Sequence, residues 1–259
     1  SEFISLYSGS SGNCSVVRTG EKYIIIDMGK GVRTTRGAKE LGLNISDCAG
    51  ILVTHEHSDH VKGLATFLKK NPLPVYGADD TLDFLDANGI VPASCALRTL
   101  SGGEEDVGDF GVTMFPTSTR AMLGYRIHTP DNKTMTIATD LGVLTPPVHQ
   151  ALSGCDLVAL ESNYDLHMLR SGRYPYLPAL PHRVQPRGHL SNDECSAKLL
   201  ELIQEGCKKF ASAIPQENNT PALALQTMFN TLGAAGVVPE KDCIVQAQRR
   251  NEISPALTF

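Results

Sequence analysis

Short apolar runs rich in β-branched residues alternate with helical patterns along nearly the whole chain. Near the start, residues Phe3–Leu6, Ser15–Arg18 and Tyr23–Ile26 have the composition of strands, and turn-rich segments join them. This pattern predicts an opening β-meander. Later strand-like runs predict a second sheet, and they are Val112–Phe115, Gly124–Ile127, Thr134–Ala138 and Leu157–Leu160.

Helical patterns follow the meander and return near the end of the chain. Ile51–Thr54 predicts a buried strand, Val61–Lys70 a short helix, and Asp79–Asn88 an amphipathic helix with Asp79 or Asp80 as its N-cap. The pattern of the first half is therefore strand, loop, then helix.

In the last third, the pattern predicts two more helices and a strand. Ser191 is expected to cap a helix over Asp193–Gln204, with Glu194 three residues after the cap. Pro221–Leu232 predicts another helix, and a strand is expected around Ile244–Gln246. A meander followed by strands and helices in alternation favours an α/β fold, with two packed sheets and helices outside them.

Composition and length are those of an ordinary globular protein. The 259 residues include 28 acidic and 23 basic side chains, which gives a formal charge of −5, and 41% are hydrophobic. No compositional linker divides residues 1–259, so we expect a single domain. The apolar runs are far shorter than the ~20 residues that span a bilayer, and the chain shows no signal-peptide pattern, so membrane-spanning and secreted proteins are not expected.

The seven cysteines are odd in number and are never spaced as Cys-x-x-Cys. This pattern is neither a disulfide framework nor a zinc ribbon. We interpret them as reduced thiols in a cytoplasmic protein, each a small buried apolar side chain rather than a nucleophile.

The segment from His55 to His60 combines three histidines with acidic residues directly after a predicted strand and before a predicted helix. Imidazole and carboxylate groups are ligands that suit Zn²⁺, with Mn²⁺ or Fe²⁺ as alternatives. A loop at the end of a strand can turn neighbouring side chains toward one point. The alternative interpretation is a solvated loop whose histidines bind no metal.

This His-x-His-x-Asp-His loop resembles the signature of the metallo-β-lactamase superfamily. Other segments extend the resemblance in matching order, namely residues 3–13, 53–60 and 62–64, Thr139-Asp140, Glu161-Ser162-Asn163 and Gly188-His189-Leu190-Ser191-Asn192. Together they are similar to the YycJ/WalJ-like branch of DNA exonucleases, which is related to ribonucleases Z and J. The resemblance covers almost the entire chain and implies a four-layered αβ/βα sandwich and a metal-dependent hydrolase.

The resemblance also implies how two metal ions are bound. His55 and His57 would serve one ion, Asp59 and His60 the other, and Asp140 would bridge them. Two such cations lower the pKa of a shared water and stabilise charge on a phosphodiester in the transition state. We therefore expect a phosphodiesterase or nuclease that acts on DNA or an oligonucleotide.

Two residues are expected to move protons in that reaction. Asp59 would orient or deprotonate the bridging hydroxide, and His189 would protonate the leaving oxygen. The alternative for His189 is that it only bonds to the backbone before the helix capped by Ser191.

The chain departs from the pattern that the resemblance implies. Thr119 and Ala213 stand where relatives carry a further histidine for each metal, and Tyr164 also replaces a histidine. The loss leaves three protein ligands per ion, so the metal affinity should fall. Arg120 replaces an acid, and its fixed charge opposes metal binding unless it turns away or faces a substrate phosphate.

Other histidines are alternatives for the missing ligands, but we expect each of them at the surface. They are His128, His149, His167 and His182.

The stretch Leu166–Asn192 is rich in arginine and has no Asp or Glu. Arg170, Arg173 and Arg187 lie in it, and together with Arg120 they are our candidates for contact with substrate phosphates. The alternative is a solvated connector near the mouth of the site.

Two further functions stay open alongside the nuclease. One is a catalytically silent protein that keeps the fold and binds nucleic acid or another ligand, and the other is a hydrolase of thioesters or lactams, because the metal loop alone does not select the bond. The sequence leaves the metal identity and the oligomeric state undetermined.

Overall fold

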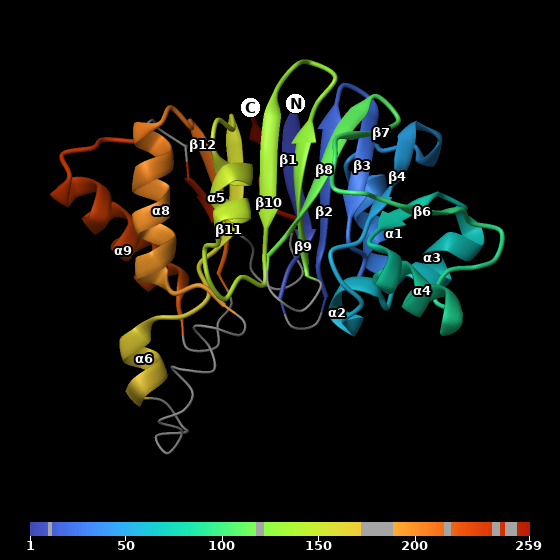
Figure 1. The fold of residues 1–259 in the computed structure, drawn as a ribbon, viewed down its shortest axis with the longest axis horizontal. Coiled ribbons are helices and arrows are strands. Elements are labelled where there is room, and N and C mark those ends of the chain that lie inside the picture. The colour runs from blue at the N-terminus through green and yellow to red at the C-terminus, as the bar shows by residue number, and fades with distance from the viewer. Residues whose placement is uncertain (10–11, 118–121, 172–188, 215–218, 240–243, 247–252) are drawn as a thin grey trace.

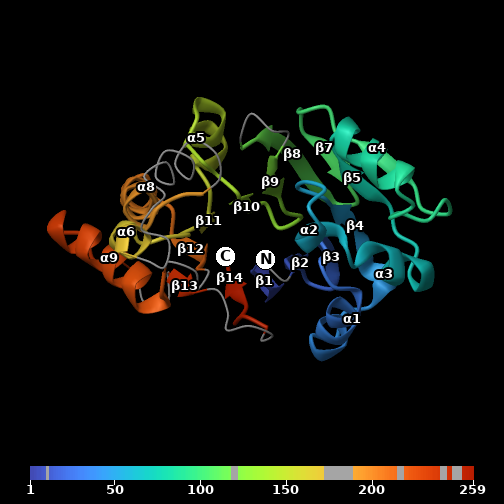
Figure 2. The ribbon, with the colours of Figure 1, turned by 90° about the horizontal axis from the view of Figure 1, so that it is seen from below.

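Two β-sheets packed face to face form the centre of the molecule, and helices cover their outer faces (Figures 1 and 2). The structure is a computed structural model that describes all residues except 10–11, 118–121, 172–188, 215–218, 240–243 and 247–252. Helices α1, α3 and α4 lie beside the first sheet, and α5, α8 and α9 lie beside the second (Figure 2). The predicted four-layered α/β sandwich is therefore confirmed.

The first sheet combines the N-terminal strands with the last strand of the chain. Its order is β14-β1-β2-β3-β4-β5-β6. The antiparallel pairing of β1, β2 and β3 confirms the opening meander, and β3 to β6 pair in parallel. The bounds are β1 Glu2–Tyr7, β2 Cys14–Thr19, β3 Lys22–Ile26, β4 Cys48–Leu52, β5 Val75–Gly77, β6 Leu97–Thr99 and β14 Leu257–Thr258.

The second sheet has the order β13-β12-β11-β10-β9-β8-β7. Strands β7 to β10 pair antiparallel, and β10 to β13 pair in parallel. The bounds are β7 Glu105–Val107, β8 Phe110–Pro116, β9 Leu123–His128, β10 Thr134–Ala138, β11 Leu157–Glu161, β12 Lys209–Ala213 and β13 Ile244–Gln246.

The helices connect the parallel strands. Their bounds are α1 Gly31–Glu40, the short 3₁₀ helix η1 Ile45–Asp47, α2 Ser58–Val61, α3 Leu64–Lys70, α4 Asp79–Ala87, α5 Pro146–Leu152, α6 Leu166–Ser171, α8 Asn192–Gln204 and α9 Pro221–Ala234. Among the described residues, no helix is long and apolar enough to span a membrane.

Alternating side chains of the strands fill three apolar layers. In β3, Ile24 and Ile26 face the layer between the two sheets, whereas Tyr23 and Ile25 face the layer under α1 and α3. A third layer lies between the second sheet and its helices. Each sheet thus buries both of its faces, which explains why the strands appear as nearly continuous apolar runs.

The cysteines contribute to these layers as predicted. Six of them are buried and free of disulfides, and Cys243 lies outside the described residues. Burial raises the pKa of Cys14, Cys48 and Cys195 to about 12. These thiols are therefore protonated at neutral pH and act as small apolar side chains.

Two predicted helices differ in detail from the structure. The helix predicted over Val61–Lys70 is two helices, α2 and α3, separated by Lys62 and Gly63, and a Cβ on Gly63 would lie closer than 3.0 Å to backbone atoms of Lys30. The N-cap of α4 is Ala78, without a side-chain cap, so the prediction of Asp79 or Asp80 was wrong, and both lie in the first helical turn.

Helix α1 was not predicted because its buried face carries no large apolar residue. Its buried positions are Gly31, Thr34 and Gly37. These small residues allow the helix to pack closely on the sheet without producing the apolar stripe by which amphipathic helices are recognised. The expectation of a single domain stays a prediction.

Candidate metal centre

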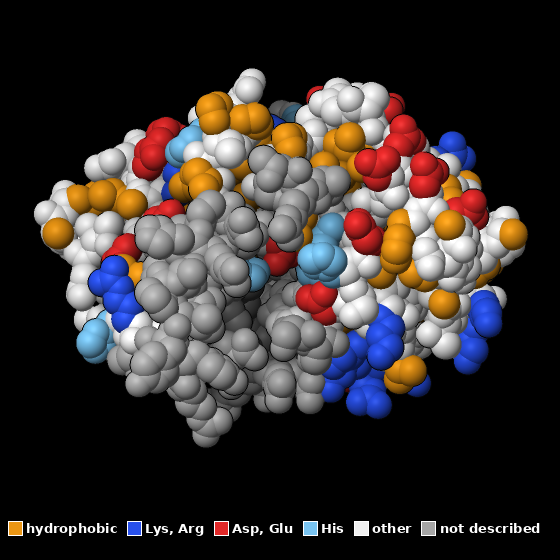
Figure 3. Space-filling model, turned by 60° about the horizontal axis from the view of Figure 1, so that its bottom comes forward, with side chains coloured by type: hydrophobic (Ala, Val, Ile, Leu, Met, Phe, Trp, Pro, Cys, Tyr) orange, Lys and Arg blue, Asp and Glu red, His pale blue; other side chains and the backbone are white. Residues whose placement is uncertain are grey.

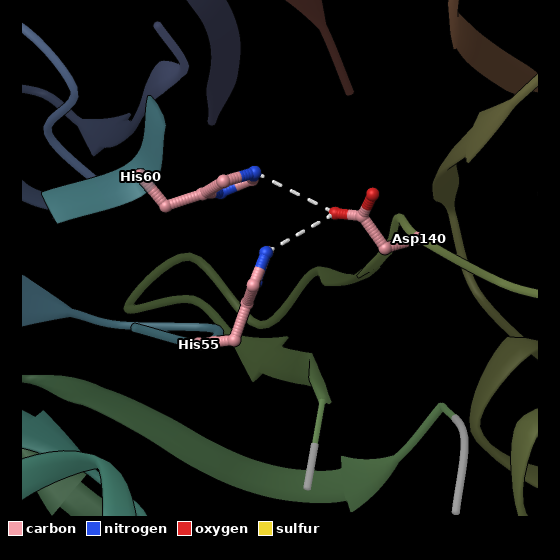
Figure 4. Close-up of side chains that lie close together, drawn as sticks. All are labelled: His55, His60 and Asp140. Atoms are coloured by element: carbon pink, nitrogen blue, oxygen red, sulfur yellow. Dashed lines mark ion pairs between the residues drawn. The ribbon is translucent and has the colours of Figure 1, made fainter. Parts of the chain in front are cut away.

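Loops from the two sheets meet at one edge of the sandwich and bring three possible metal ligands together. His55 and His60 follow β4 of the first sheet, and Asp140 follows β10 of the second. Ligand atoms of these three residues lie within 4.8 Å of one another (Figure 4). Asp140 Oδ2 lies 3.8 Å from His55 Nε2 and 3.5 Å from His60 Nε2, and therefore faces both imidazoles.

The other two predicted ligands lie next to this group. Asp59 Oδ2 is 3.3 Å from His60 Nε2, and the exposed ring of His57 packs edge-on against His55 with 4.5 Å between the ring centroids. Asn13 donates a hydrogen bond from Nδ2 to Asp59 Oδ2 over 3.1 Å. All five predicted ligands therefore gather in one place.

The buried carboxylate of Asp27 sets the orientation of both inner imidazoles. Its Oδ2 accepts hydrogen bonds from His60 Nδ1 and from Thr54 Oγ1, each over 2.7 Å. Because the single hydroxyl proton of Thr54 is used on Asp27, His55 Nδ1 is the donor in its 2.9 Å bond with Thr54 Oγ1. Both Nε2 atoms are thereby left to face Asp140, as second-layer carboxylates commonly arrange around metals.

Two aspartates adopt an unusual backbone conformation where the strands end. Asp27 has φ 60° and Asp140 has φ 55°, in the left-handed region that non-glycine residues rarely adopt. Asp27 Oδ1 accepts the backbone N–H of Thr54, and Glu161 accepts that of Leu141 directly after Asp140. Backbone strain that neighbouring groups hold in place is common at functional sites.

Burial and neighbouring charges shift the protonation of the cluster. Burial and the charge of His60 lower the pKa of His55, which keeps its Nε2 lone pair available. Burial opposes the charged form of His60, but the charge and hydrogen bond of Asp27 outweigh it and raise its pKa to about 10. Burial raises the pKa of Asp59, but the hydrogen bond and the charge of His60 outweigh burial and hold that pKa below the ordinary value.

The donors present fit a divalent cation. His55 Nε2 is buried and, among the described residues, has no hydrogen-bond partner. An unsatisfied buried nitrogen is costly unless something binds it, and this one faces the carboxylate of Asp140. Imidazole nitrogens combined with carboxylate oxygens suit Zn²⁺, Mn²⁺ or Fe²⁺.

His189 lies beside the cluster and is held by a second buried carboxylate. Its Nδ1 donates to Glu161 Oε2 over 3.0 Å and lies 3.9 Å from Asp140 Oδ1. Burial opposes protonation of His189, but Glu161 and Asp140 outweigh it and raise its pKa. The alternative in which His189 bonds only to backbone is wrong, since its partner is the side chain of Glu161.

Several positions that the sequence singled out lie partly or wholly outside the described residues. Thr119, Arg120, Arg173, Arg187 and His182 are among them, and for Ala213 only the backbone is described, at the end of β12 opposite Glu161. Arg170 is exposed on α6, which projects below the sandwich in Figure 1.

The remaining candidate histidines do not join the cluster. His128, His149 and His167 are exposed, as predicted.

No sequence pattern indicated the roles of Asp27, Thr54 and Glu161 in this site. Asp27 directly follows β3, and His55 lies three residues after the end of β4. This shared position after an apolar strand is the signal that could have identified Asp27. No spacing in the sequence indicates that Asp27 and His60 are in contact.

A family model and two curated relatives match most of this chain. The family model described as "Beta-lactamase superfamily domain" matches residues 22–208. Exodeoxyribonuclease YycJ from Bacillus anthracis is 32% identical over 240 residues, which is 90% of each chain. Exodeoxyribonuclease WalJ from Streptococcus pneumoniae is 30% identical over 238 residues, covering 89% of this chain and 87% of the relative.

Solved structures share the fold at low sequence identity. The crystal structure of Zn²⁺-bound PqqB from Methylobacterium extorquens matches this chain with a TM-score of 0.73 and 14% identity, and the match covers 100% of both chains. At this identity the match concerns the fold alone.

Proposed function

Because this chain belongs to the beta-lactamase superfamily and to its YycJ/WalJ-like branch, we propose that it is a metal-dependent exodeoxyribonuclease. The relatives with that name match about nine-tenths of the chain, and the cluster around Asp140 has the donors that such a hydrolase needs. The reaction is hydrolysis of a phosphodiester bond of DNA. We place it in the cytoplasm, in keeping with the six free cysteines in the described part of the chain.

The ligand assignment follows the family pattern. His55 and His57 would hold one ion, Asp59 and His60 a second, and the position of Asp140 between the two inner imidazoles supports its role as a bridge. We propose zinc, with manganese or iron as alternatives. When bound, the ions supply an activated water and neutralise charge on the phosphate.

The protein's own groups would orient the reactants and move protons. Asp59 has one oxygen near His60 and is held by Asn13, a position from which it can orient the attacking water. His189 has its Nδ1–H fixed by Glu161, which leaves Nε2 to deliver a proton to the leaving oxygen. Without that proton, the leaving group would depart as an alkoxide.

The observation that carries the proposal is the buried His55 Nε2, which has no hydrogen-bond partner in the described structure and faces Asp140. The test is metal analysis of protein purified without chelators, together with digestion of end-labelled single-stranded DNA. We expect bound Zn, Mn or Fe, and loss of digestion in His57→Ala. His128→Ala is the matched control, because this histidine is exposed on β9 away from the cluster. Less than about a tenth of an equivalent of metal after reloading would contradict the proposal.

A second candidate is a protein that binds DNA without cleaving it. Thr119 and Ala213, which stand at positions expected to supply histidines, favour it. The same experiment separates the two, because DNA binding without any metal-dependent digestion supports the silent protein.

A further inference from the structure

The metal centre lies between two surfaces of opposite charge. Figure 3 shows Asp and Glu side chains over α4 on one side of the histidines, and Lys and Arg side chains over α1 on the other. We call the first the acidic rim, formed by the exposed Asp79, Asp80, Asp83 and Asp86. We call the second the basic rim, formed by Lys30, Arg33, Arg36 and Lys62.

The basic rim is attached directly to the loop that carries the candidate ligands. Met28 donates its N–H to the carbonyl of His60, and Gly63 donates to the carbonyl of Met28. Lys62 is two residues after His60 in the chain, and the first residue of α1, Gly31, packs on the backbone of Gly63. A Cβ on Gly31 would lie 2.9 Å from the carbonyl oxygen of Gly63, so α1 and the α2–α3 junction are in close contact.

Three cations of the basic rim, Arg33, Arg36 and Lys62, are available to an anion. Arg36 and Lys62 are exposed and Arg33 is half-buried. None of these three forms an ion pair with a carboxylate in the part of the chain that the structure describes.

The range of these charges is short. Salt at physiological strength screens them over about 8 Å, so they act on a phosphate only when the strand lies on the rim itself. The overall charge of −5 gives no general attraction to DNA, which makes this local surface decisive for where a strand lies.

We propose that a single DNA strand whose scissile phosphate is at the metal centre continues over the basic rim and is kept off the acidic rim. Lys30, Arg33, Arg36 and Lys62 then contact phosphates of the nucleotides next to the cleaved bond. The inference rests on the proposed nuclease function and adds the path of the substrate.

The test compares two variants that each lose three positive charges. Arg33→Gln/Arg36→Gln/Lys62→Gln removes charge from the basic rim. Lys133→Gln/Lys208→Gln/Lys209→Gln removes it near the opposite ends of β10 and β12, far from the metal centre. Fluorescence anisotropy with a 12-nucleotide single strand is measured against salt concentration, and hydrolysis of bis(p-nitrophenyl) phosphate is measured in parallel.

The basic-rim variant should lose at least about tenfold in DNA affinity at 0.1 M salt, and its log–log salt slope should fall by about 2, since each single-strand phosphate contact contributes ~0.7. Hydrolysis of the small diester should not change, because it needs only the metal centre. The control variant should keep the wild-type slope.

A second measurement on the wild-type protein does not depend on the folding of a variant. Bound DNA should slow acetylation of Lys30 and Lys62 but not of Lys133 and Lys208.

The outcomes separate this inference from the proposed function. If the basic-rim variant keeps the wild-type salt slope and still hydrolyses the small diester, the proposed path of the DNA strand is wrong. The proposed nuclease function then still stands. Loss of DNA binding in that variant, when even the wild type hydrolyses neither substrate, supports the basic rim as a DNA-binding surface but contradicts the proposed nuclease function. Loss of binding to phosphatidylglycerol vesicles with an unchanged DNA slope would assign the rim to lipid and overturn the inference.

Discussion

Asp27 is outside the proposed ligand set, yet three groups of the site depend on it. It accepts hydrogen bonds from the Thr54 backbone, the Thr54 hydroxyl and His60 Nδ1. The carboxylate thereby fixes which imidazole nitrogens face Asp140. A metal centre built this way is ordered before the ion arrives, because the orientation of its ligands is set by the protein.

Removing this negative charge should weaken metal binding. In Asp27→Asn we expect the affinity for Zn²⁺ to fall by roughly 10–100-fold, since an amide neither orients nor polarises His60 as a carboxylate does. Competition with a chromophoric chelator measures the change. Asp106→Asn is the control, because Asp106 is exposed on β7. An unchanged affinity would show that Asp27 does not orient His60 for binding.

His189 should affect turnover more than metal content. His189→Asn is expected to reduce kcat by about 10²–10⁴ while the bound metal stays within twofold of the wild type, because the residue is a proposed proton donor and not a proposed ligand. Metal analysis and single-turnover digestion of the same preparation check this. Loss of metal in parallel with activity would instead make His189 a ligand.

At the residue scale, the cluster of candidate ligands could be predicted from the sequence. The residues that support this cluster could not. His55, His60 and Asp140 carry a dense pattern or a resemblance, and they do lie together. Asp27 is a single acid after a strand, and its bond to His60 joins positions 33 residues apart. A contact of that kind depends on how the chain folds back on itself, which no local pattern encodes.

At the scale of elements, glycines decide how closely the β3–α1 connection approaches the loop of residues 55–60, which carries candidate ligands and is called the ligand loop below. A Cβ on Gly29 would lie closer than 3.0 Å to the carbonyl oxygen of Asp59 and to backbone atoms of Gly12 and Asn13. The close approach is therefore possible only without a side chain. The same contact positions Asp59 and the backbone of the basic rim.

Adding one methyl group at Gly29 should displace the ligand loop. We expect Gly29→Ala to lower the free energy of unfolding by about 1–3 kcal/mol, the usual cost of overpacking a tight contact. Metal affinity should fall as well. Urea unfolding measures the first effect, with Gly103→Ala as control because a Cβ there meets nothing within 4 Å. Equal stability of the two variants would contradict the close packing.

The cap of α8 illustrates where sequence patterns work best. Ser191 and Glu194 form the predicted capping box, with the Glu194 N–H bonded to Ser191 Oγ over 3.1 Å. Local hydrogen bonds over three residues are encoded in the sequence itself. The short strands β5 and β6 and helix α1 were missed because their formation depends on partners distant in the chain.

Loss of this cap should destabilise the helix next to His189. In Ser191→Ala we expect a loss of about 0.5–2 kcal/mol in the free energy of unfolding. Chemical denaturation followed by circular dichroism measures it. A change below about 0.2 kcal/mol would show that the capping box contributes nothing to stability.

For the whole molecule, the buried thiols predict how stability changes with pH. Burial raises the pKa of Cys14, Cys48 and Cys195 from 9.0 to about 12 and that of Cys207 to about 11. The unfolded chain therefore loses these protons first as pH rises. Their contribution to stability is complete below pH ~9 and is lost as the pH approaches the folded values.

Between pH 9 and 10, where the unfolded thiols go from half to mostly ionised, the free energy of unfolding should fall by roughly 1 kcal/mol for each fully buried thiol. Urea unfolding in reducing buffer at several pH values measures the slope. Cys195→Ala should make the slope of the free energy of unfolding against pH shallower by the contribution of one thiol. A stability that does not change from pH 8 to 10 would contradict the burial of these cysteines.

The proposed metal ligands follow strands of two different sheets, and this origin has a thermodynamic consequence. An ion that joins His55 and His60 to Asp140 cross-links the N-terminal and C-terminal halves of the chain, and unfolding of either half must release it. At a free ion concentration a thousand times the Kd, such linkage adds about 4 kcal/mol to the free energy of unfolding. Metal starvation would then reduce the lifetime of the folded protein as well as its turnover, so its abundance in the cell would follow the supply of the ion.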